Sequence, residues 1–158
     1  MLITDMTKAA ARQICSWNYE YPYSVYNYLP YDEAVRTGAR ITLSEYKNDY
    51  LCFWNENDTL IGYLSLIKKA DKLFLGIGLA PEYCSKGLGK TILLQSIKIT
   101  NQRYGDEAEI WVQVRSWNER AIKCYTSCGF EAQYCEELPD RFGNIENFCF
   151  MNNNFEIL

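Results

Sequence analysis

The chain contains 158 residues and carries a formal net charge of −4 at pH 7, with no basic stripe along it. This charge distribution excludes the phosphate-backbone footprint of a nucleic-acid-binding protein, so we expect no nucleic-acid partner. Apolar residues make up 48% and aromatic residues 15% of the chain, which is typical of a globular protein with a packed core. We expect residues 1–158 to form one domain.

The beginning of the chain predicts two helices joined by an aromatic connection. Residues 7–17, TKAAARQICSW, predict a helix behind a Thr or Asp cap, and residues 31–38, YDEAVRTG, predict a short helix that ends at its glycine. The connection holds six tyrosines from Tyr19 to Tyr31. Its pattern fits neither the helical nor the strand period. We call this connection the tyrosine segment.

The middle of the chain reads as strands. Residues 50–67 predict two strands around an Asn-Glu-Asn-Asp turn, which indicates a hairpin. Residues 71–81 predict a third strand that stops at a proline. The glycines at positions 76 and 78 indicate a bulge or the close approach of another backbone. This strand leads directly into the octet CSKGLGKT, residues 84–91.

Helices and strands alternate after the octet. The expected elements are a helix over 91–105, a strand over 107–116, a helix over 118–129, and two strands over 130–138 and 145–153. In the first of these helices Leu93, Ile97 and Tyr104 share one face. Asn118 is the expected N-cap of the second helix.

Two residue types limit the chemistry. The sequence contains no histidine, which removes the commonest general base and the commonest zinc ligand, so no metal is expected. The seven cysteines form an odd set without a C-x-x-C motif or paired spacing, as is typical of a reducing cytosol. The sequence shows neither a signal peptide nor an apolar span that could cross a membrane. We therefore expect a cytoplasmic protein with no membrane partner.

The octet resembles two kinds of phosphate-binding turn. A nucleotide P-loop needs a glycine where Cys84 stands, and the best later strand, EIWVQV, ends in Arg115 and Ser116 instead of a carboxylate for Mg²⁺. A shorter glycine turn fits better, because Gly87 and Gly89 let backbone N–H groups point at a pyrophosphate near the start of a helix. On these residues alone, a plain strand-to-helix turn fits equally well.

Together with its neighbours, the octet resembles the GNAT superfamily of N-acetyltransferases, whose signature is Q/R-x-x-G-x-G/A followed by N-x-x-A-x-x-x-Y-x-x-x-G-F. The second half matches at Asn118, Ala121, Tyr125, Gly129 and Phe130. The resemblance implies an α+β fold with a single mixed, mostly antiparallel sheet of six to seven strands. This sheet is splayed in the middle and flanked by about four helices. The chain looks closest to enzymes that acetylate protein N-terminal amines.

The resemblance implies transfer of an acetyl group from acetyl-CoA to a primary amine of a small molecule or a protein, by direct attack. The pantetheine arm of the coenzyme would pair with the backbone of Ile77, Gly78 and Leu79. Asn118 would hydrogen-bond the coenzyme, a role compatible with that of an N-cap. The pyrophosphate would be held by the backbone N–H groups of Ser85, Lys86, Gly87, Leu88, Gly89 and Lys90.

Two residues carry the implied catalysis. Tyr125 stands where the family places the general acid that protonates the departing thiolate. Its alternative role is that of a core tyrosine. Gln113 stands where the N-terminal amine branch carries a glutamate general base, and an amide cannot take up a proton. Gln113 would then orient a water, unless the base is one of the other candidates, Glu20, Glu136 and Glu137, for each of which a solvated surface position is the alternative.

Two positions depart from the family pattern and leave a different function possible for this chain. Cys84 replaces the usual Gln or Arg, at a position where the backbone matters most, and we expect no catalytic cysteine there. Gln113 makes conceivable a catalytically silent CoA-binding or protein-interaction module on the same fold, and a P-loop phosphotransferase ranks third. The family also implies that the tyrosine segment lines one wall of the acceptor site and that the loop PDRFGN closes over it. We expect a monomer or a homodimer.

Overall fold

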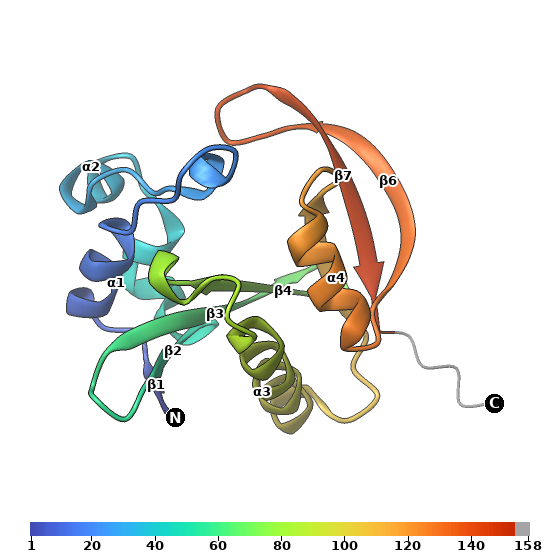
Figure 1. Ribbon diagram of the computed structural model, residues 1–158, viewed down its shortest axis with the longest axis horizontal. Helices are drawn as coiled ribbons and strands as arrows, with labels where there is room; N and C mark the ends of the chain where they lie inside the picture. The colour runs from blue at the N-terminus through green and yellow to red at the C-terminus, as the bar shows by residue number, and fades with distance from the viewer. Residues whose placement is uncertain (154–158) are drawn as a thin grey trace. The chain divides into compact units, whose positions relative to one another are not determined.

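The computed structural model describes residues 1–153, which form seven strands, four α-helices and four short 3-10 helices (Figure 1). The elements in chain order are β1 (Leu2–Asp5), α1 (Lys8–Cys15), η1 (Tyr23–Tyr26), α2 (Tyr31–Arg36), η2 (Arg40–Thr42), η3 (Ser44–Asp49), β2 (Tyr50–Trp54), β3 (Leu60–Lys69), β4 (Lys72–Leu79), η4 (Pro81–Tyr83), α3 (Leu88–Tyr104), β5 (Ile110–Arg115), α4 (Glu119–Ser127), β6 (Glu131–Pro139) and β7 (Ile145–Asn152).

The seven strands of the described residues form one mixed sheet in the hydrogen-bonded order β1-β2-β3-β4-β5-β7-β6. Strand β4 pairs with β5 in parallel, whereas β1 with β2, β2 with β3, and β7 with both β5 and β6 pair antiparallel. This arrangement confirms the expected α+β class. The residues group into two compact units: unit 1 contains Met1–Ser65 and Ile77–Leu88, and unit 2 contains Leu66–Gly76 and the residues from Gly89 onward.

Helix α1 begins where the sequence predicts. The hydroxyl oxygen of Thr7, the N-cap, accepts a hydrogen bond from the N–H of Ala10 at 3.1 Å, which satisfies one of the free donors of the first turn. The opposite surface of the helix is exposed, and its apolar face enters the core of unit 1. This core consists of Met6, Ala10, Ala11, Ile14, Cys15, Ala34, Ile41, Tyr50, Cys52 and Leu60.

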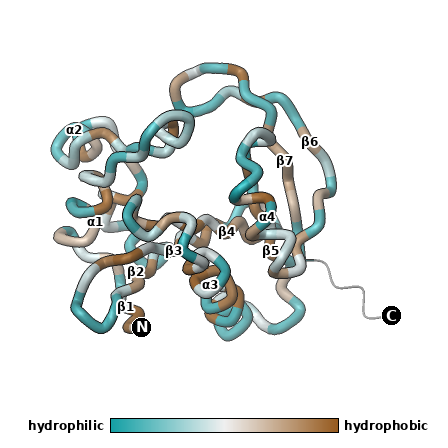
Figure 2. The backbone as a smooth tube through the Cα atoms, viewed as in Figure 1, coloured by the Kyte–Doolittle hydropathy of each residue, from teal (hydrophilic) through white to brown (hydrophobic). Residues whose placement is uncertain are grey.

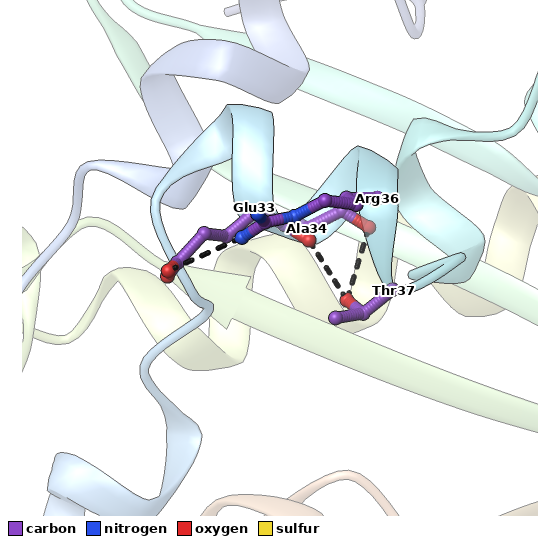
Figure 3. A network of polar contacts seen from close by, with 4 residues as sticks. All are labelled: Glu33, Ala34, Arg36 and Thr37. Atoms are coloured by element: carbon purple, nitrogen blue, oxygen red, sulfur yellow. Dashed lines mark hydrogen bonds and ion pairs between the residues drawn. The ribbon is translucent and has the colours of Figure 1, made fainter.

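Helix α2 lies beside α1 in unit 1 and ends where the sequence predicts (Figures 1 and 3). The hydroxyl of Thr37 donates to the carbonyl oxygens of Glu33 at 3.0 Å and Ala34 at 3.3 Å. Arg36 pairs with Glu33 at 3.4 Å across one turn of the exposed surface. Gly38 then adopts a left-handed φ of 74°, the conformation that commonly ends a helix.

Strand β1 and the 3-10 helices lie outside the elements expected from the sequence. Only the two central residues of β1 are half-buried, so this four-residue strand is too short to show an alternating pattern. Within the tyrosine segment, η1 turns with about three residues per turn. This period explains why the segment matches neither the α-helical nor the strand pattern.

Helix α3 buries part of the face predicted to carry Leu93, Ile97 and Tyr104. Leu93 is fully buried and Ile97 half-buried, whereas Tyr104, in the last turn, is 48% exposed. Ser96 and Thr100 are fully buried instead, because each hydroxyl donates to the carbonyl oxygen four residues earlier, at 2.7 and 2.8 Å. These bonds satisfy the two polar side chains within the helix and let them join Ile92 and Leu93 on the buried side. Figure 2 shows hydrophilic and hydrophobic residues mixed along α3.

Strands β6 and β7 form a long hairpin in unit 2 (Figure 1). A register shift between Ala132 and Tyr134 sets the pairing, so that Cys135 lies directly opposite Cys149. The two cysteines form a disulfide. The cysteine spacing did not predict it, because their 14-residue separation has meaning only once the hairpin register is known. The Cys135–Cys149 disulfide does not include the other described cysteines, which stand at positions 15, 52, 84, 124 and 128.

Candidate functional site

The turn between β4 and α3 contains two residues with a left-handed backbone. Ser85 has a φ of 61° and Gly87 a φ of 81°, so two left-handed residues lie on either side of Lys86. Left-handed residues next to right-handed ones bring successive backbone N–H groups to one side of a turn. Helix α3 begins immediately afterwards, at Leu88. The pyrophosphate cradle predicted for Ser85 to Lys90 stays a prediction, and the local backbone suits it.

The glycine at position 87 is required by conformation and not by space. A Cβ atom at this position would meet nothing within 4 Å, but its φ lies in the region that L-residues rarely adopt. Ser85, Lys86 and Gly87 are exposed, as is Lys90 in the first turn of α3. The two lysines add positive charge to this end of the helix, where the helix dipole is also positive.

Cys84 is tied to the backbone of the strand end. Its thiol donates to the carbonyl oxygens of Ala80 at 3.6 Å and Leu79 at 3.9 Å. The side chain is half-buried. This arrangement supports a structural role for Cys84 and gives no support to a catalytic one.

Gly78 lies against an aromatic ring. A Cβ atom at this position would lie 2.7 Å from Cζ and 2.9 Å from Cδ1 of Tyr63, which is closer than real side chains approach. The expected reason for the glycine, a bulge or close approach of another backbone, is therefore corrected to the close approach of a side chain. The ring of Tyr63 is packed in turn against Trp17 and Tyr50, with ring centroids 6.1 and 6.4 Å apart. Burial raises the pKa of Tyr50 well above its ordinary value.

The end of β4 is also held by hydrogen bonds. The N–H of Ala80 donates to the carbonyl oxygen of Ile61 at 2.9 Å, and the hydroxyl of Tyr19 donates to the carbonyl oxygen of Leu79. Tyr19 belongs to the tyrosine segment, 60 residues earlier in the chain. The sequence places Tyr19 only among six tyrosines, and it carries no signal for this contact.

A cavity of about 530 Å³ opens in unit 1 at the tyrosine segment. Its charged groups are Arg12, Asp32 and Glu33, so carboxylates outnumber cations. Arg12 lies 3.7 Å from Asp32 and 4.4 Å from the centre of the Tyr31 ring. The lining residues are Arg12, Cys15, Ser16, Trp17, Asn18, Asn27, Tyr28, Pro30, Tyr31, Asp32 and Glu33.

In unit 2, Tyr125 lies in helix α4 and Asn118 immediately precedes that helix. Tyr125 is 7% exposed, and its ring meets that of Phe130 edge to face at 5.8 Å. The packing of a core tyrosine is therefore present, and the role of general acid stays a prediction. The amide oxygen of Asn118 accepts from the N–H of Ala121 at 3.1 Å, which confirms Asn118 as the N-cap. Its contact with the coenzyme stays a prediction.

Gln113 is the one exposed residue of β5, whose burial pattern otherwise keeps every side chain inside. It lies opposite Phe150 of β7 in the register. The alternative bases Glu20, Glu136 and Glu137 are all exposed as well. Water can therefore reach each of the four candidates, and burial does not distinguish between them.

A buried cation holds the loop between β6 and β7. Arg115 is 8% exposed and lies 3.6 Å from Asp140 and 3.7 Å from Glu146. Burial pushes the pKa of Asp140 up, but N–H groups of Asn144 and Phe142 and the charge of Arg115 together bring it below its ordinary value. The sequence of the loop PDRFGN predicts only a turn. The residue that could have indicated the loop's structure is its aspartate, which accepts hydrogen bonds from the N–H groups two and four residues later.

Residues 1–153 contain no group of three or more Cys, Asp or Glu side chains placed to hold a metal ion. Within the same residues, no helix is long and apolar enough to cross a membrane.

Comparisons with known proteins agree with the fold. The sequence model of the Acetyltransferase (GNAT) family matches residues 11–130. No curated protein matches the sequence. Among solved structures, the spermidine N-acetyltransferase from Vibrio cholerae in complex with CoA and spermine is 18% identical, with a TM-score of 0.75, over 96% of this chain and 93% of that one.

Two further solved structures are similar. A GNAT superfamily phosphinothricin acetyltransferase from Sinorhizobium meliloti, in complex with AcCoA, is 20% identical, with a TM-score of 0.70, over 96% of this chain and 86% of that one. The ribosomal-protein-S18-alanine N-acetyltransferase from Escherichia coli is 20% identical, with a TM-score of 0.65, over 99% and 97%. At these identities the likeness establishes the fold.

Proposed function

The chain belongs to the GNAT family of acetyltransferases, and from this we propose that it transfers an acetyl group from acetyl-CoA to a primary amine. The observation that carries the proposal is the family match over residues 11–130, which includes the strand, the left-handed turn and the helix from β4 to α3. The proposal treats residues 1–158 as one catalytic domain. It requires acetyl-CoA as a co-substrate and no metal.

The coenzyme is proposed to bind along backbone groups. Its pantetheine arm pairs with Ile77 to Leu79, its pyrophosphate binds the N–H groups of Ser85 to Lys90, and Asn118 adds a side-chain contact. The left-handed residues of the turn and the positive start of α3 support this assignment. Backbone N–H groups in such a cradle hold the pyrophosphate without a metal ion.

The proposed reaction needs no covalent enzyme intermediate. The neutral amine attacks the thioester carbonyl, and the N–H of Leu79 stabilises the oxygen that becomes negative. The C–S bond then breaks, and Tyr125 donates its phenolic proton to the sulfur. A cationic acceptor gives up one proton to solvent before it attacks as the neutral amine. After the attack its second proton passes to water near Gln113 or to one of Glu20, Glu136 and Glu137, and the Tyr125 phenolate recovers a proton from solvent. The products are an acetylated amine and free CoA.

The acceptor is proposed to be a cationic amine. Trp17, Tyr28 and Tyr31 line the cavity of unit 1, and Asp32 and Glu33 add negative charge. Ring faces and carboxylates both attract an ammonium group. Two solved relatives are named for amines of this kind, spermidine with spermine in one case and the alanine of a ribosomal protein in the other.

A silent CoA-binding module on the same fold is the second candidate. The observation that favours it is Gln113, an exposed amide at the position where the N-terminal amine branch carries a glutamate. Such a module would bind acetyl-CoA and release no thiol in the presence of any amine. The P-loop phosphotransferase remains third, because Cys84 takes the place of the first glycine of that motif.

The test is a direct assay of the purified protein. Acetyl-CoA is mixed with spermidine, with an alanine-terminated peptide and with small primary amines, while the release of free thiol is followed and the products are weighed by mass spectrometry. We expect amine-dependent thiol release with at least one class. Acetyl-CoA binding without release for any amine would favour the silent module, and tight Mg-ATP binding would favour the phosphotransferase.

The location and assembly state complete the proposal. We propose the cytoplasm, where the Cys135–Cys149 pair would be reduced, and a monomer or homodimer. Size-exclusion chromatography with light scattering distinguishes the two assembly states.

A further inference from the structure

The geometry points to Tyr19 as a positioning residue that fixes the end of β4 for acetyl-CoA. The inference rests on the proposed function, because it concerns the strand assigned to the pantetheine arm. It deepens that function by naming a side chain of the tyrosine segment that would act on coenzyme binding through the backbone of β4.

The peptide group between Leu79 and Ala80 is held on both sides. Its carbonyl oxygen accepts from the hydroxyl of Tyr19, and its N–H donates to Ile61 at 2.9 Å. A peptide group is planar, so two opposed hydrogen bonds fix the orientation of the whole plane. The two bonds thereby hold the Leu79 carbonyl at the end of the segment assigned to the pantetheine arm, one residue position from the N–H proposed to stabilise the reacting oxygen.

Tyr19 is itself held by a second side chain. The amide oxygen of Asn27 accepts from the N–H of Tyr19 at 2.7 Å, and the amide nitrogen of Asn27 donates to the Tyr19 carbonyl at 3.3 Å. The same nitrogen donates to the side chain of Asn18 at 3.0 Å. Asn27 therefore engages both backbone groups of Tyr19 and closes the segment between them into a loop. The phenol is directed at β4 by a fixed backbone.

The neighbouring residue of β4 is fixed from its side-chain face. The ring of Tyr63 fills the space that a side chain at Gly78 would occupy. Gly78 and Leu79 are thus restrained by two tyrosines from different parts of unit 1. Restraint before binding lowers the entropy that the coenzyme must overcome when it pairs with the strand. A strand end that is free to rotate would pair less well.

The central experiment compares Tyr19→Phe with Tyr21→Phe. The first change removes the hydroxyl that donates to the Leu79 carbonyl and leaves the 3.9 Å contact of the Cys84 thiol with the same oxygen. Tyr21 is 91% exposed and serves as the matched control. Loss of one net hydrogen bond corresponds to a change of about three- to tenfold in a binding constant. We expect Tyr19→Phe to raise the Kd and the KM for acetyl-CoA by this factor, with a smaller change in kcat. Tyr21→Phe should change neither constant.

Two further readouts separate positioning from packing. Hydrogen exchange of the Ala80 amide should be faster in Tyr19→Phe than in Tyr21→Phe, because one side of the peptide is released. Asn27→Ala should weaken acetyl-CoA binding through Tyr19, so its effect should be smaller in the Tyr19→Phe background than alone. If Tyr19→Phe fails to fold, the acetyl-CoA affinity of Asn27→Ala decides the question.

The outcomes are distinct for the two proposals. If the unchanged protein binds acetyl-CoA and folded Tyr19→Phe binds it as tightly as Tyr21→Phe does, the positioning role is wrong and the proposed function stands. A lower melting temperature with an unchanged Kd overturns it in the same way, because that is the signature of packing alone. If the unchanged protein binds no acetyl-CoA, both proposals fail.

Discussion

The end of β4 and the turn that follows it are adjacent in the chain, but they are held in different ways. Leu79 and Gly78 are fixed by side chains that come from elsewhere in unit 1. The turn at Ser85 and Gly87 is fixed by its own left-handed backbone, and Gly87 has open space around it. The strand end therefore depends on long-range contacts, and the turn depends on local conformation.

The largest effect is expected at Tyr125, which takes no part in the long-range contacts of the strand end or in the local conformation of the turn. Tyr125→Phe keeps the ring that packs on Phe130 and removes the proposed acid. A positioned general acid contributes roughly 10² to 10⁴ in rate, so kcat should fall by at least about tenfold. The Kd for acetyl-CoA should not change, because strand end and turn are intact.

The control for this variant is Tyr134→Phe, a change to an exposed tyrosine that stacks on Phe150 at 4.7 Å. Single-turnover acetyl transfer, measured with folded proteins, provides the comparison. Equal rates for Tyr125→Phe and the unchanged protein would leave Tyr125 as a core residue only.

The next effect tests the strand end. Gly78→Ala places a Cβ atom against the ring of Tyr63, and an overpacked site of this kind costs about 1–3 kcal/mol in the free energy of unfolding. We expect this loss in urea denaturation, together with weaker acetyl-CoA binding. Tyr63→Leu in the same chain should recover part of the stability, because it removes the obstacle. No recovery would mean that the clash lies elsewhere.

A smaller effect is expected at the turn. Gly87→Ala should lower the free energy of unfolding by about 1 kcal/mol, because alanine is strained at a left-handed φ. Gly87→Asn should lose less, since asparagine tolerates this region. The matched control is Gly105→Ala, another left-handed glycine with open space. It should lose similar stability and keep acetyl-CoA affinity, which Gly87→Ala should reduce. Equal affinities for the two variants would argue against the cradle.

The smallest effect is a dependence on pH in the loop between β6 and β7. The pKa of Asp140 is lower in the folded chain than its ordinary value of 3.8, so its stabilising effect is present above that value. It is lost as the pH falls through the lower, folded pKa. The free energy of unfolding, measured by denaturation between pH 7 and pH 3, should therefore fall less steeply toward the acid end in Asp140→Asn than in the unchanged protein. An unchanged slope would contradict the lowered pKa of Asp140.

The distinction between local conformation and long-range contacts explains which features the sequence could predict. Thr7, Asn118 and Gly38 act on residues within one turn, and the ends of three helices followed from them. The family signature supplied the candidate residues of the turn and of α4. The contact of Tyr19 with Leu79 spans 60 residues, and nothing in either neighbourhood marks it.

Two differences share one physical cause. The ring beside Gly78 and the pairing of Cys135 with Cys149 depend on a partner that only the folded chain supplies. A pattern of polar and apolar residues records burial and period, and it does not record register or the identity of a distant neighbour. Long-range partners are therefore the part of this site that required coordinates.

The disulfide of the hairpin has a consequence for proteolysis. Arg141 and Phe142 lie exposed in the loop, and Cys135 and Cys149 are linked on either side of it. In purified protein with this disulfide formed, a single cut by trypsin or chymotrypsin in the loop would divide the chain into two pieces that remain covalently attached. Nicked protein would migrate as one band in a denaturing gel without a reducing agent and as two bands with it.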